Sequence, residues 1–330
     1  MAGSRFGRRR RRNAAIALGG ASLAVTGALI GGSIVVEMMT RDGDAGRVTA
    51  DWSLLPVHYL ERPDGRIAFD DSGGSGPLVV AIPSLGDLRQ EYRFLRPLLL
   101  AEGYRLVTVD LRGHGQSSTG WPDYAADAIG GDIVALLEYL DAGPATIIGT
   151  SMAAGAAVWA GAAAPNRVAG LTLVGPFVRD LPPSPVQSLM LKVLIRRPWG
   201  PAAWSLYYKS LYPTQLPNDL TDYRAALKAN LKEPGRFRAL QAMLGASKAA
   251  VEARLADVEA PVLVVMGSKD PDFPDPAAEA RLVAERLNGR VMLIDGAGHY
   301  PHVEMPEATA PAILAFLREI RTGTVVAGGR

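Results

Sequence analysis

The stretch ATIIGTSMAAGAA, residues 145–157, decides how this chain folds. An apolar run ends at Gly149, Ser151 follows two residues later, and an alanine-rich run comes next. This pattern is typical of a buried strand, a sharp turn and a helix. Such a turn strains the backbone of its serine and lifts the hydroxyl above the end of a sheet. Gly149 and Ala153 supply the small side chains that the turn needs, although Ala153 stands where the motif usually has glycine.

Ser151 also has a plainer interpretation. Serine is common at helix N-termini, where its hydroxyl caps a free backbone N–H. On this stretch alone the two interpretations are nearly balanced, so the rest of the chain has to decide between them.

Strand and helix patterns alternate from about residue 57 onward. Residues 58–61 and 66–70 flank the turn sequence Pro63-Asp64-Gly65 and predict a hairpin. Apolar strand segments follow at residues 77–83, 105–109, 146–149, 168–174, 261–266 and 290–294. Asp87 predicts the start of a helix that runs to residue 100. The alternation predicts an α/β fold, a mostly parallel central sheet with helices on both faces.

One segment interrupts this alternation. Between residues 174 and 261 prolines at 182, 183 and 185 precede helix-like stretches such as 205–211 and 220–231. We therefore predict an inserted helical lid at residues 177–250. It divides the core into a first part, 51–176, and a second part, 251–321, and residues 322–330 form a tail.

The N-terminal region has its own organisation. Residues 1–13 form a basic tail, residues 14–36 are 23 uncharged residues, and residues 37–50 look like a linker. As a helix the uncharged segment would span about 34 Å, enough for a hydrocarbon core of ~30 Å. We predict a single transmembrane anchor that holds the remainder outside the cytoplasm. A signal segment, cleaved to release a secreted protein, is the alternative.

The charge distribution argues against a nucleic-acid partner. Six arginines lie in the first twelve residues, so the remaining chain has 35 − 6 = 29 basic residues against 33 acidic ones. The body is mildly acidic, and a nucleic-acid groove is not expected. The chain has no cysteine, which excludes disulfides, thiolate metal sites and a cysteine nucleophile.

Taken together, four motifs resemble those of the α/β-hydrolase superfamily, over roughly residues 57–321. They are DLRGHGQS at 110–117, the turn at Ser151, GSKD at 267–270 and GAGH at 296–299. Serine, aspartate and histidine follow one another in the order that this fold requires.

The resemblance implies a catalytic triad. Ser151 is the expected nucleophile and His299 the base that removes its proton. Asp270 is the expected partner of the histidine, with Asp272, Asp275 and Asp180 as alternatives. Of the three, Asp275 precedes a proline and reads as a helix cap. His114 belongs to a turn that is structural in this superfamily, and His302 lacks the further ligands of a metal site.

An oxyanion in such an enzyme needs two backbone donors. The N–H of Met152 follows the nucleophile at a helix N-terminus, and the N–H of Leu85 lies in the loop after the strand at residues 77–83. The superfamily often has His-Gly in that loop, where this chain has Pro83-Ser84-Leu85-Gly86. In the lid, Trp204 and Tyr208 are the aromatic residues expected to touch substrate.

The sequence thus predicts a carboxylesterase-like serine hydrolase acting on a small ester-like molecule. Lactonases, C–C bond hydrolases and perhydrolases use the same triad and are alternatives. A non-catalytic ligand-binding protein is a further alternative, although it has no need of an activated nucleophile. No cofactor and no metal are expected, and nothing in the sequence indicates the oligomeric state.

Overall fold

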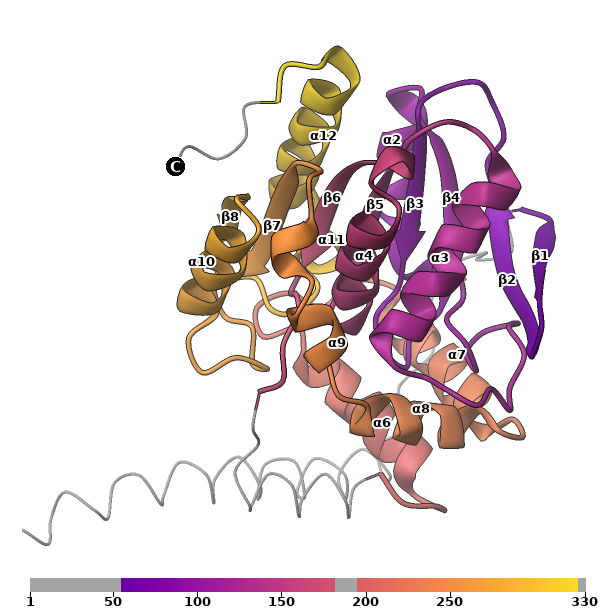
Figure 1. The fold of residues 1–330 in the computed structure, drawn as a ribbon. Coiled ribbons are helices and arrows are strands. Elements are labelled where there is room, and N and C mark those ends of the chain that lie inside the picture. The colour runs from indigo at the N-terminus through magenta and orange to yellow at the C-terminus, as the bar shows by residue number, and fades with distance from the viewer. Residues whose placement is uncertain (1–54, 182–194, 326–330) are drawn as a thin grey trace, which may run out of the picture. The chain divides into compact units, whose positions relative to one another are not determined.

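A computed structural model describes residues 55–181 and 195–325 of this chain. Its centre is a sheet of eight strands in the order β1-β2-β4-β3-β5-β6-β7-β8 (Figure 1). The strands are β1 (Val57–Arg62), β2 (Gly65–Asp71), β3 (Leu78–Ile82), β4 (Arg105–Val109), β5 (Ala145–Thr150), β6 (Val168–Val174), β7 (Val262–Gly267) and β8 (Arg290–Ile294). Strand β2 pairs antiparallel with both β1 and β4, and the remaining pairs are parallel. The predicted mostly parallel sheet is confirmed.

Each face of the sheet packs against its own helices. In β3 the side chain of Val79 joins one apolar cluster and that of Val80 the other, because successive residues of a strand point to opposite faces. The helices on the Val80 face are α3 (Ala126–Leu140), α4 (Met152–Ala163) and α10 (Pro276–Arg286); those on the Val79 face are α2 (Arg96–Ala101) and α12 (Pro306–Thr322). Burial on both faces explains why the inner strands β3, β5, β6 and β7 are mostly apolar.

The sequence patterns place the strands well and one helix poorly. The predicted hairpin is confirmed by β1 and β2, in which Arg62 pairs with Gly65. The helix predicted from Asp87 to residue 100 is wrong as a single element, because the chain forms η1 (Arg89–Arg93) and then α2. Pro97 has no N–H to donate to the carbonyl of Arg93, so a continuous helix would lose a bond there.

The segment between β6 and β7 is helical, as the sequence predicts. Its described helices are α6 (Gly200–Ser210), α7 (Leu220–Lys232), α8 (Arg236–Gly245) and α9 (Ala249–Glu252), followed by η3 (Leu255–Asp257). Helices α6, α7 and α8 lie beyond one end of the sheet (Figure 1). Two short elements complete the chain, η2 (Pro165–Arg167) before β6 and α11 (Pro301–Glu304) before α12.

The predicted membrane anchor needs correction. None of the helices within residues 55–181 and 195–325 is both long enough and apolar enough to cross a membrane. The segment at residues 14–36, on which the prediction depended, lies outside the described residues. We therefore withdraw the membrane anchor and the extracytoplasmic location that was inferred from it.

Candidate active site

Ser151 lies in the turn between β5 and α4 with an unusual backbone conformation. Its φ is 59° and its ψ is −121°, a region in which glycine is the usual residue. The hydroxyl makes no capping bond to α4, although Ser151 occupies the N-cap position. Its backbone is held instead by the sheet end, because its N–H donates to the carbonyl of Val174 over 2.8 Å. The helix-cap interpretation is therefore wrong for this serine.

The small residues around Ser151 allow this turn to close. A Cβ on Gly149 would lie 2.7 Å from the carbonyl oxygen of Ala153, which is closer than such contacts occur in proteins. Ala153 is itself fully buried. The strand and the helix therefore approach so closely that the residue two before the serine must be glycine.

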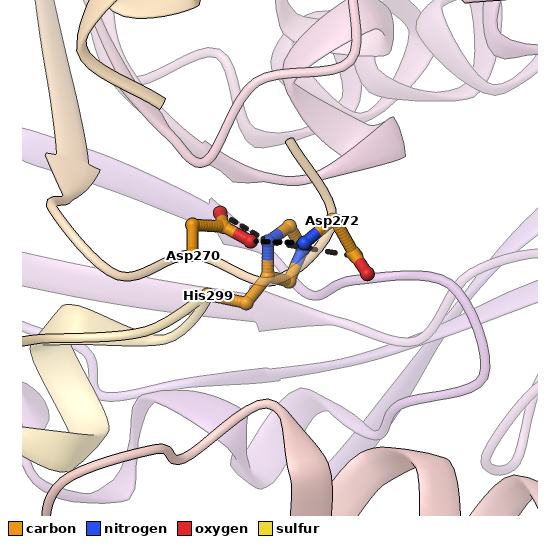
Figure 2. Close-up of side chains that lie close together, drawn as sticks. All are labelled: Asp270, Asp272 and His299. Carbon is orange, nitrogen blue, oxygen red and sulfur yellow. Dashed lines mark hydrogen bonds and ion pairs between the residues drawn. The ribbon is translucent and has the colours of Figure 1, made fainter. Parts of the chain in front are cut away.

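Asp270 and His299 meet at the ends of two adjacent strands (Figure 2). Asp270 follows β7, His299 follows β8, and Nδ1 of His299 lies 2.7 Å from Oδ2 of Asp270. Gly175, directly after β6, has φ 51°, and a Cβ there would lie 3.0 Å from the imidazole. The chain after β6 thus passes against the histidine ring at a position that strongly favours glycine.

The other three candidate carboxylates lie elsewhere or bind other groups. Asp272 Oδ2 is 3.7 Å from Nδ1 of His299, and both oxygens of Asp272 accept from the hydroxyl of Tyr207. Asp275 accepts from the N–H of Ala278 and caps α10, as the sequence predicts. The carboxylate of Asp180 accepts from the Ser247 hydroxyl and from the N–H of Lys248. Among the four, Asp270 alone hydrogen-bonds to the imidazole.

The charge state of His299 reflects its two acidic neighbours. Burial by itself would lower the pKa of His299, but the negative charges of Asp270 and Asp272 outweigh burial and raise the pKa to about 9. The pKa of Asp272 is raised above its ordinary value, first by burial and then by the charge of Asp270, while the charge of His299 opposes both. The imidazole is therefore a stronger base than a solvent-exposed histidine, whose pKa is about 6.5.

The structure does not join Ser151 to His299 directly. Within the described residues the Ser151 hydroxyl makes no hydrogen bond to the imidazole. Both residues border the same chain segment, since Ser151 binds Val174 and the imidazole lies against Gly175. Catalytic hydrogen bonds are often long in free enzymes and shorten when substrate binds.

The two backbone donors predicted for the oxyanion are free. In the part of the chain that the structure describes, neither the N–H of Leu85 nor that of Met152 has a hydrogen-bond partner. Met152 is the first residue of α4, and Leu85 lies in a turn in which the N–H of Asp87 donates to the carbonyl of Ser84. Gly86 has φ 72°, as the third position of a type II turn requires. Both donors predicted for the oxyanion are thus available to a ligand.

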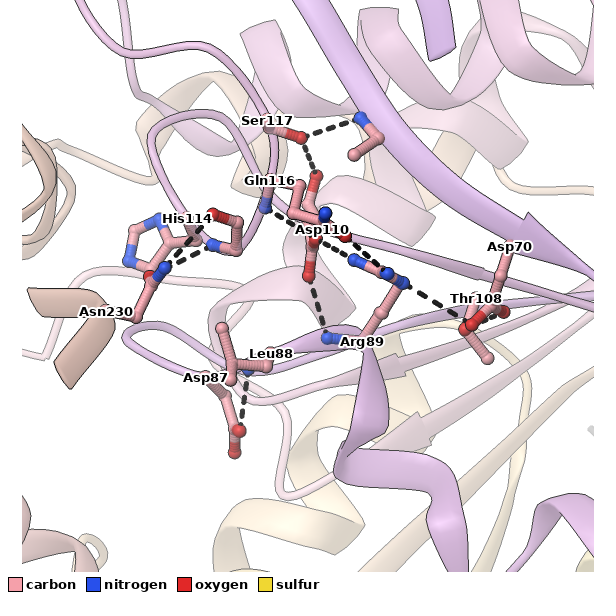
Figure 3. Close-up of polar contacts among 12 residues, drawn as sticks. Asp70, Asp87, Leu88, Arg89, Thr108, Asp110, His114, Gln116, Ser117 and Asn230 are labelled. Carbon is pink, nitrogen blue, oxygen red and sulfur yellow. Dashed lines mark hydrogen bonds and ion pairs between the residues drawn. The ribbon is translucent and has the colours of Figure 1, made fainter. Parts of the chain in front are cut away.

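Residues of the DLRGHGQS motif hydrogen-bond to this turn and to the segment that follows it (Figure 3). The carboxylate of Asp110 accepts from the N–H of Arg89, from the guanidinium of Arg89 and from the N–H of Gln116. His114 accepts from the N–H of Gly86 at Nε2, over 3.2 Å, and its Nδ1 faces the carbonyl of Arg112. Burial lowers the pKa of His114 to about 4, so the ring is neutral. This histidine has a structural role, as the resemblance implies.

His302 binds a carboxylate on η1. Its Nε2 lies 3.1 Å from Oε1 of Glu91, and burial lowers the pKa of His302 to about 3. The described residues contain one group of possible metal ligands, formed by Asp270, Asp272 and His299, whose ligand atoms lie within 4.8 Å of one another. The Asp270–His299 hydrogen bond and the Tyr207 hydroxyl already occupy these atoms, so the group fits a proton-transfer pair better than a metal site.

Sequence reasoning missed Glu304, which fixes the histidine loop. Its carboxylate accepts from the N–H groups of Gly298, Thr214 and Gln215. The N–H of His299 in turn donates to the carbonyl of Leu211, directly after α6. No sequence motif marks Glu304, because its partners lie up to 90 residues away.

The two predicted lid contacts lie in different surroundings. A Cβ on Gly86 would lie 2.4 Å from Nε1 of Trp204, so the indole packs directly on the turn that contains Leu85. The indole N–H is buried and has no partner within the described residues. Tyr208 is fully buried among the rings of Tyr212, Tyr223 and Tyr300. The structure therefore places Tyr208 in the packing between the inserted helices and the loop after His299.

Comparison with known proteins identifies the class. The sequence profile described as the Alpha/beta hydrolase family matches residues 79–312. A dihydrolipoyllysine-residue acetyltransferase component of the acetoin cleaving system of Pseudomonas putida is 28% identical over an alignment 282 residues long, which covers 82% of this chain and 72% of that protein. A 3-oxoadipate enol-lactonase of Acinetobacter baylyi is 25% identical over 217 residues, 65% of this chain and 79% of that protein. The crystal structure of a bromoperoxidase from Bacillus anthracis has a TM-score of 0.70 at 22% identity and covers 80% of this chain and 100% of its own.

The chain belongs to the α/β-hydrolase family. The eight-stranded sheet, with β2 antiparallel to its neighbours, agrees with this assignment.

Proposed function

We propose that this chain is a serine hydrolase that cleaves a carboxylic ester or a related acyl compound through an acyl-enzyme. The observation that carries the proposal is the backbone of Ser151, with φ 59° and no capping bond from its hydroxyl. A serine in this region is costly and is kept where its position serves a reaction.

The surrounding groups supply the remaining steps. His299 accepts the proton of Ser151 as the hydroxyl attacks the acyl carbon, and Asp270 stabilises the imidazolium that forms. The N–H groups of Leu85 and Met152 donate to the oxyanion. The imidazolium then protonates the departing alcohol, and a water deprotonated by His299 releases the acid.

A lactone is a second candidate substrate. The relative from Acinetobacter baylyi is named as an enol-lactonase, and a lactone is a cyclic ester that opens by the same steps. A lactone opens to a single hydroxy acid, whereas a linear ester gives an acid and an alcohol. Rates of hydrolysis on a panel of linear esters and lactones distinguish the two substrate classes.

Reaction with a fluorophosphonate tests the proposed function. Such a probe phosphonylates a serine only where a base and an oxyanion site activate the hydroxyl. We expect stoichiometric labelling of the folded chain, with the adduct on the peptide that contains Ser151, and loss of labelling after heat denaturation. Absence of an adduct, or an adduct on another serine, contradicts the proposal.

We also propose that the helices α6–α8 form a lid, within the predicted range 177–250, and that Trp204 borders the acyl group. The indole lies against Gly86, next to the N–H of Leu85, and shares an apolar cluster with the Leu85 side chain. An acyl chain whose carbonyl oxygen binds Leu85 would therefore pass close to this ring.

Trp204→Ala is expected to shift the preference from short toward long acyl chains. One methylene in such a pocket contributes about 1–3 kcal/mol, or roughly 10- to 200-fold in kcat/KM. The measurement is kcat/KM for p-nitrophenyl acetate and octanoate. Leu231→Ala is the control, because Leu231 packs in the same cluster. If both variants change the two substrates by equal factors, Trp204 serves packing only.

A further inference from the structure

Of three successive N–H groups in the turn after β3, the outer two have hydrogen-bond partners and the middle one has none. The N–H of Ser84 donates to Oε2 of Glu91 over 2.6 Å, and that of Gly86 donates to Nε2 of His114 over 3.2 Å. The N–H of Leu85 between them has no partner among the described residues. The two flanking bonds thus fix the turn on either side of the one donor that stays free.

The carbonyl of Ser84 also restrains the turn. It accepts from the N–H of Asp87, and in a trans peptide the carbonyl and the following N–H point in opposite directions. Holding the carbonyl of Ser84 therefore also sets the direction of the Leu85 N–H. The orientation of this donor depends on the bonds that Ser84 makes, and Glu91 supplies one of them.

The turn η1 that contains Glu91 also reaches the strand that carries the nucleophile. Tyr92, the residue after Glu91, contacts Thr150, the residue before Ser151. Thr150 Oγ1 lies 2.9 Å from the hydroxyl of Tyr92, which donates to the carbonyl of Ile82. Two adjacent residues of η1 therefore contact the segments that carry the proposed oxyanion donors: Glu91 binds next to Leu85, and Tyr92 binds the residue before Ser151.

A third contact comes from beyond the proposed base. Oε1 of Glu91 binds His302, three residues after His299, and both side chains are buried. The neutral imidazole donates from Nε2, while its Nδ1 is buried without a partner among the described residues. Glu91 thus links the oxyanion turn to the histidine loop, although it contacts none of the proposed reacting groups.

We propose that Glu91 is a positioning residue that holds the N–H of Leu85 in the direction of the oxyanion of the acyl transition state. This role rests on the proposed hydrolase function. Without the Glu91 carboxylate, Ser151, His299 and Asp270 would stay in place, but the site would stabilise the oxyanion poorly.

The charges around Glu91 fit this role. Burial raises the pKa of Glu91 to about 7, although the hydrogen bond from the N–H of Ser84 opposes the shift. Burial and the charge of Glu91 raise the pKa of Asp87 to about 8. Glu91 therefore ionises at lower pH than Asp87, and its Oε2 accepts from the N–H of Ser84.

Substitutions at Glu91 test the role through kcat. Glu91→Ala and Glu91→Asp withdraw the acceptor from Ser84, and loss of one oxyanion donor costs on the order of 10²–10³ in kcat. We expect kcat on p-nitrophenyl acetate to fall on the order of 10²-fold in both variants, with KM changed less than threefold. Glu91→Asp keeps a buried carboxyl and gives the measurement if the alanine variant does not fold.

Glu91→Gln is the rescue variant. Its amide oxygen can still accept from Ser84, and His302 can move its proton to Nδ1 and accept from the amide nitrogen. We expect kcat within about threefold of wild type. Glu279→Ala is the matched control, because Glu279 is a buried carboxylate of α10 that pairs with Arg179 and makes none of these contacts. This control should lose stability and keep kcat.

The outcomes separate two hypotheses. A wild-type chain that neither hydrolyses esters nor reacts with a fluorophosphonate overturns the proposed function, and this role with it. If the wild-type chain turns over esters, two results overturn the positioning role alone. One is an unchanged kcat in Glu91→Asp, and the other is a kcat lowered equally in Glu91→Gln and Glu279→Ala.

Discussion

Ser151→Ala is expected to lower kcat for ester hydrolysis by about 10⁶-fold, because it removes the atom that forms the acyl-enzyme. The measurement is kcat on p-nitrophenyl acetate, with fluorophosphonate labelling of the same preparations. Loss of both together, with an unchanged circular dichroism spectrum and Tm, assigns the nucleophile to Ser151.

Ser151→Gly is the control that separates chemistry from strain. Glycine adopts the φ of 59° without cost, whereas alanine is strained there as serine is. We expect the glycine variant to be as inactive as the alanine variant and to have a higher Tm than wild type. An alanine variant that keeps a tenth of the wild-type kcat contradicts the assignment of Ser151.

The parts of the site that the sequence predicts are those set by local chemistry. The turn at Ser151 is visible because only small residues such as Gly149 allow strand and helix to approach so closely. The inner strands are visible because burial on both faces favours apolar side chains at most positions. The order of serine, aspartate and histidine then indicates the family before any contact is known.

The parts that the sequence leaves open depend on distances across the fold. Asp270 and Asp272 are two residues apart, and only the tertiary arrangement places one at 2.7 Å and the other at 3.7 Å from the imidazole. Glu91 lies in a segment that reads as an amphipathic helix, yet its partner His302 is 211 residues away. Long-range polar contacts of this kind leave no periodic pattern in a single sequence.

Asp270→Asn is expected to lower kcat by about 10⁴-fold while the fold is retained. An asparagine amide can donate to Nδ1 of His299 and select the tautomer whose Nε2 carries a proton, which cannot accept from Ser151. The variant also lacks the charge that stabilises the imidazolium. The measurement is kcat at a pH above 9, where the pKa of His299, about 9 in wild type, no longer limits the base form.

Asp272→Asn is the matched control, and we expect it to change only the pH dependence of activity. Asp272 raises the pKa of His299 through its charge and makes no hydrogen bond to the imidazole among the described residues. Since only neutral His299 can accept a proton, wild-type kcat/KM should rise with pH until about pH 9. Removing the Asp272 charge lowers the pKa of His299, so the rise moves to lower pH and activity at pH 7 increases, by about tenfold for each pKa unit lost. If Asp272→Asn instead abolishes activity at every pH and Asp270→Asn does not, then Asp272 is the triad carboxylate.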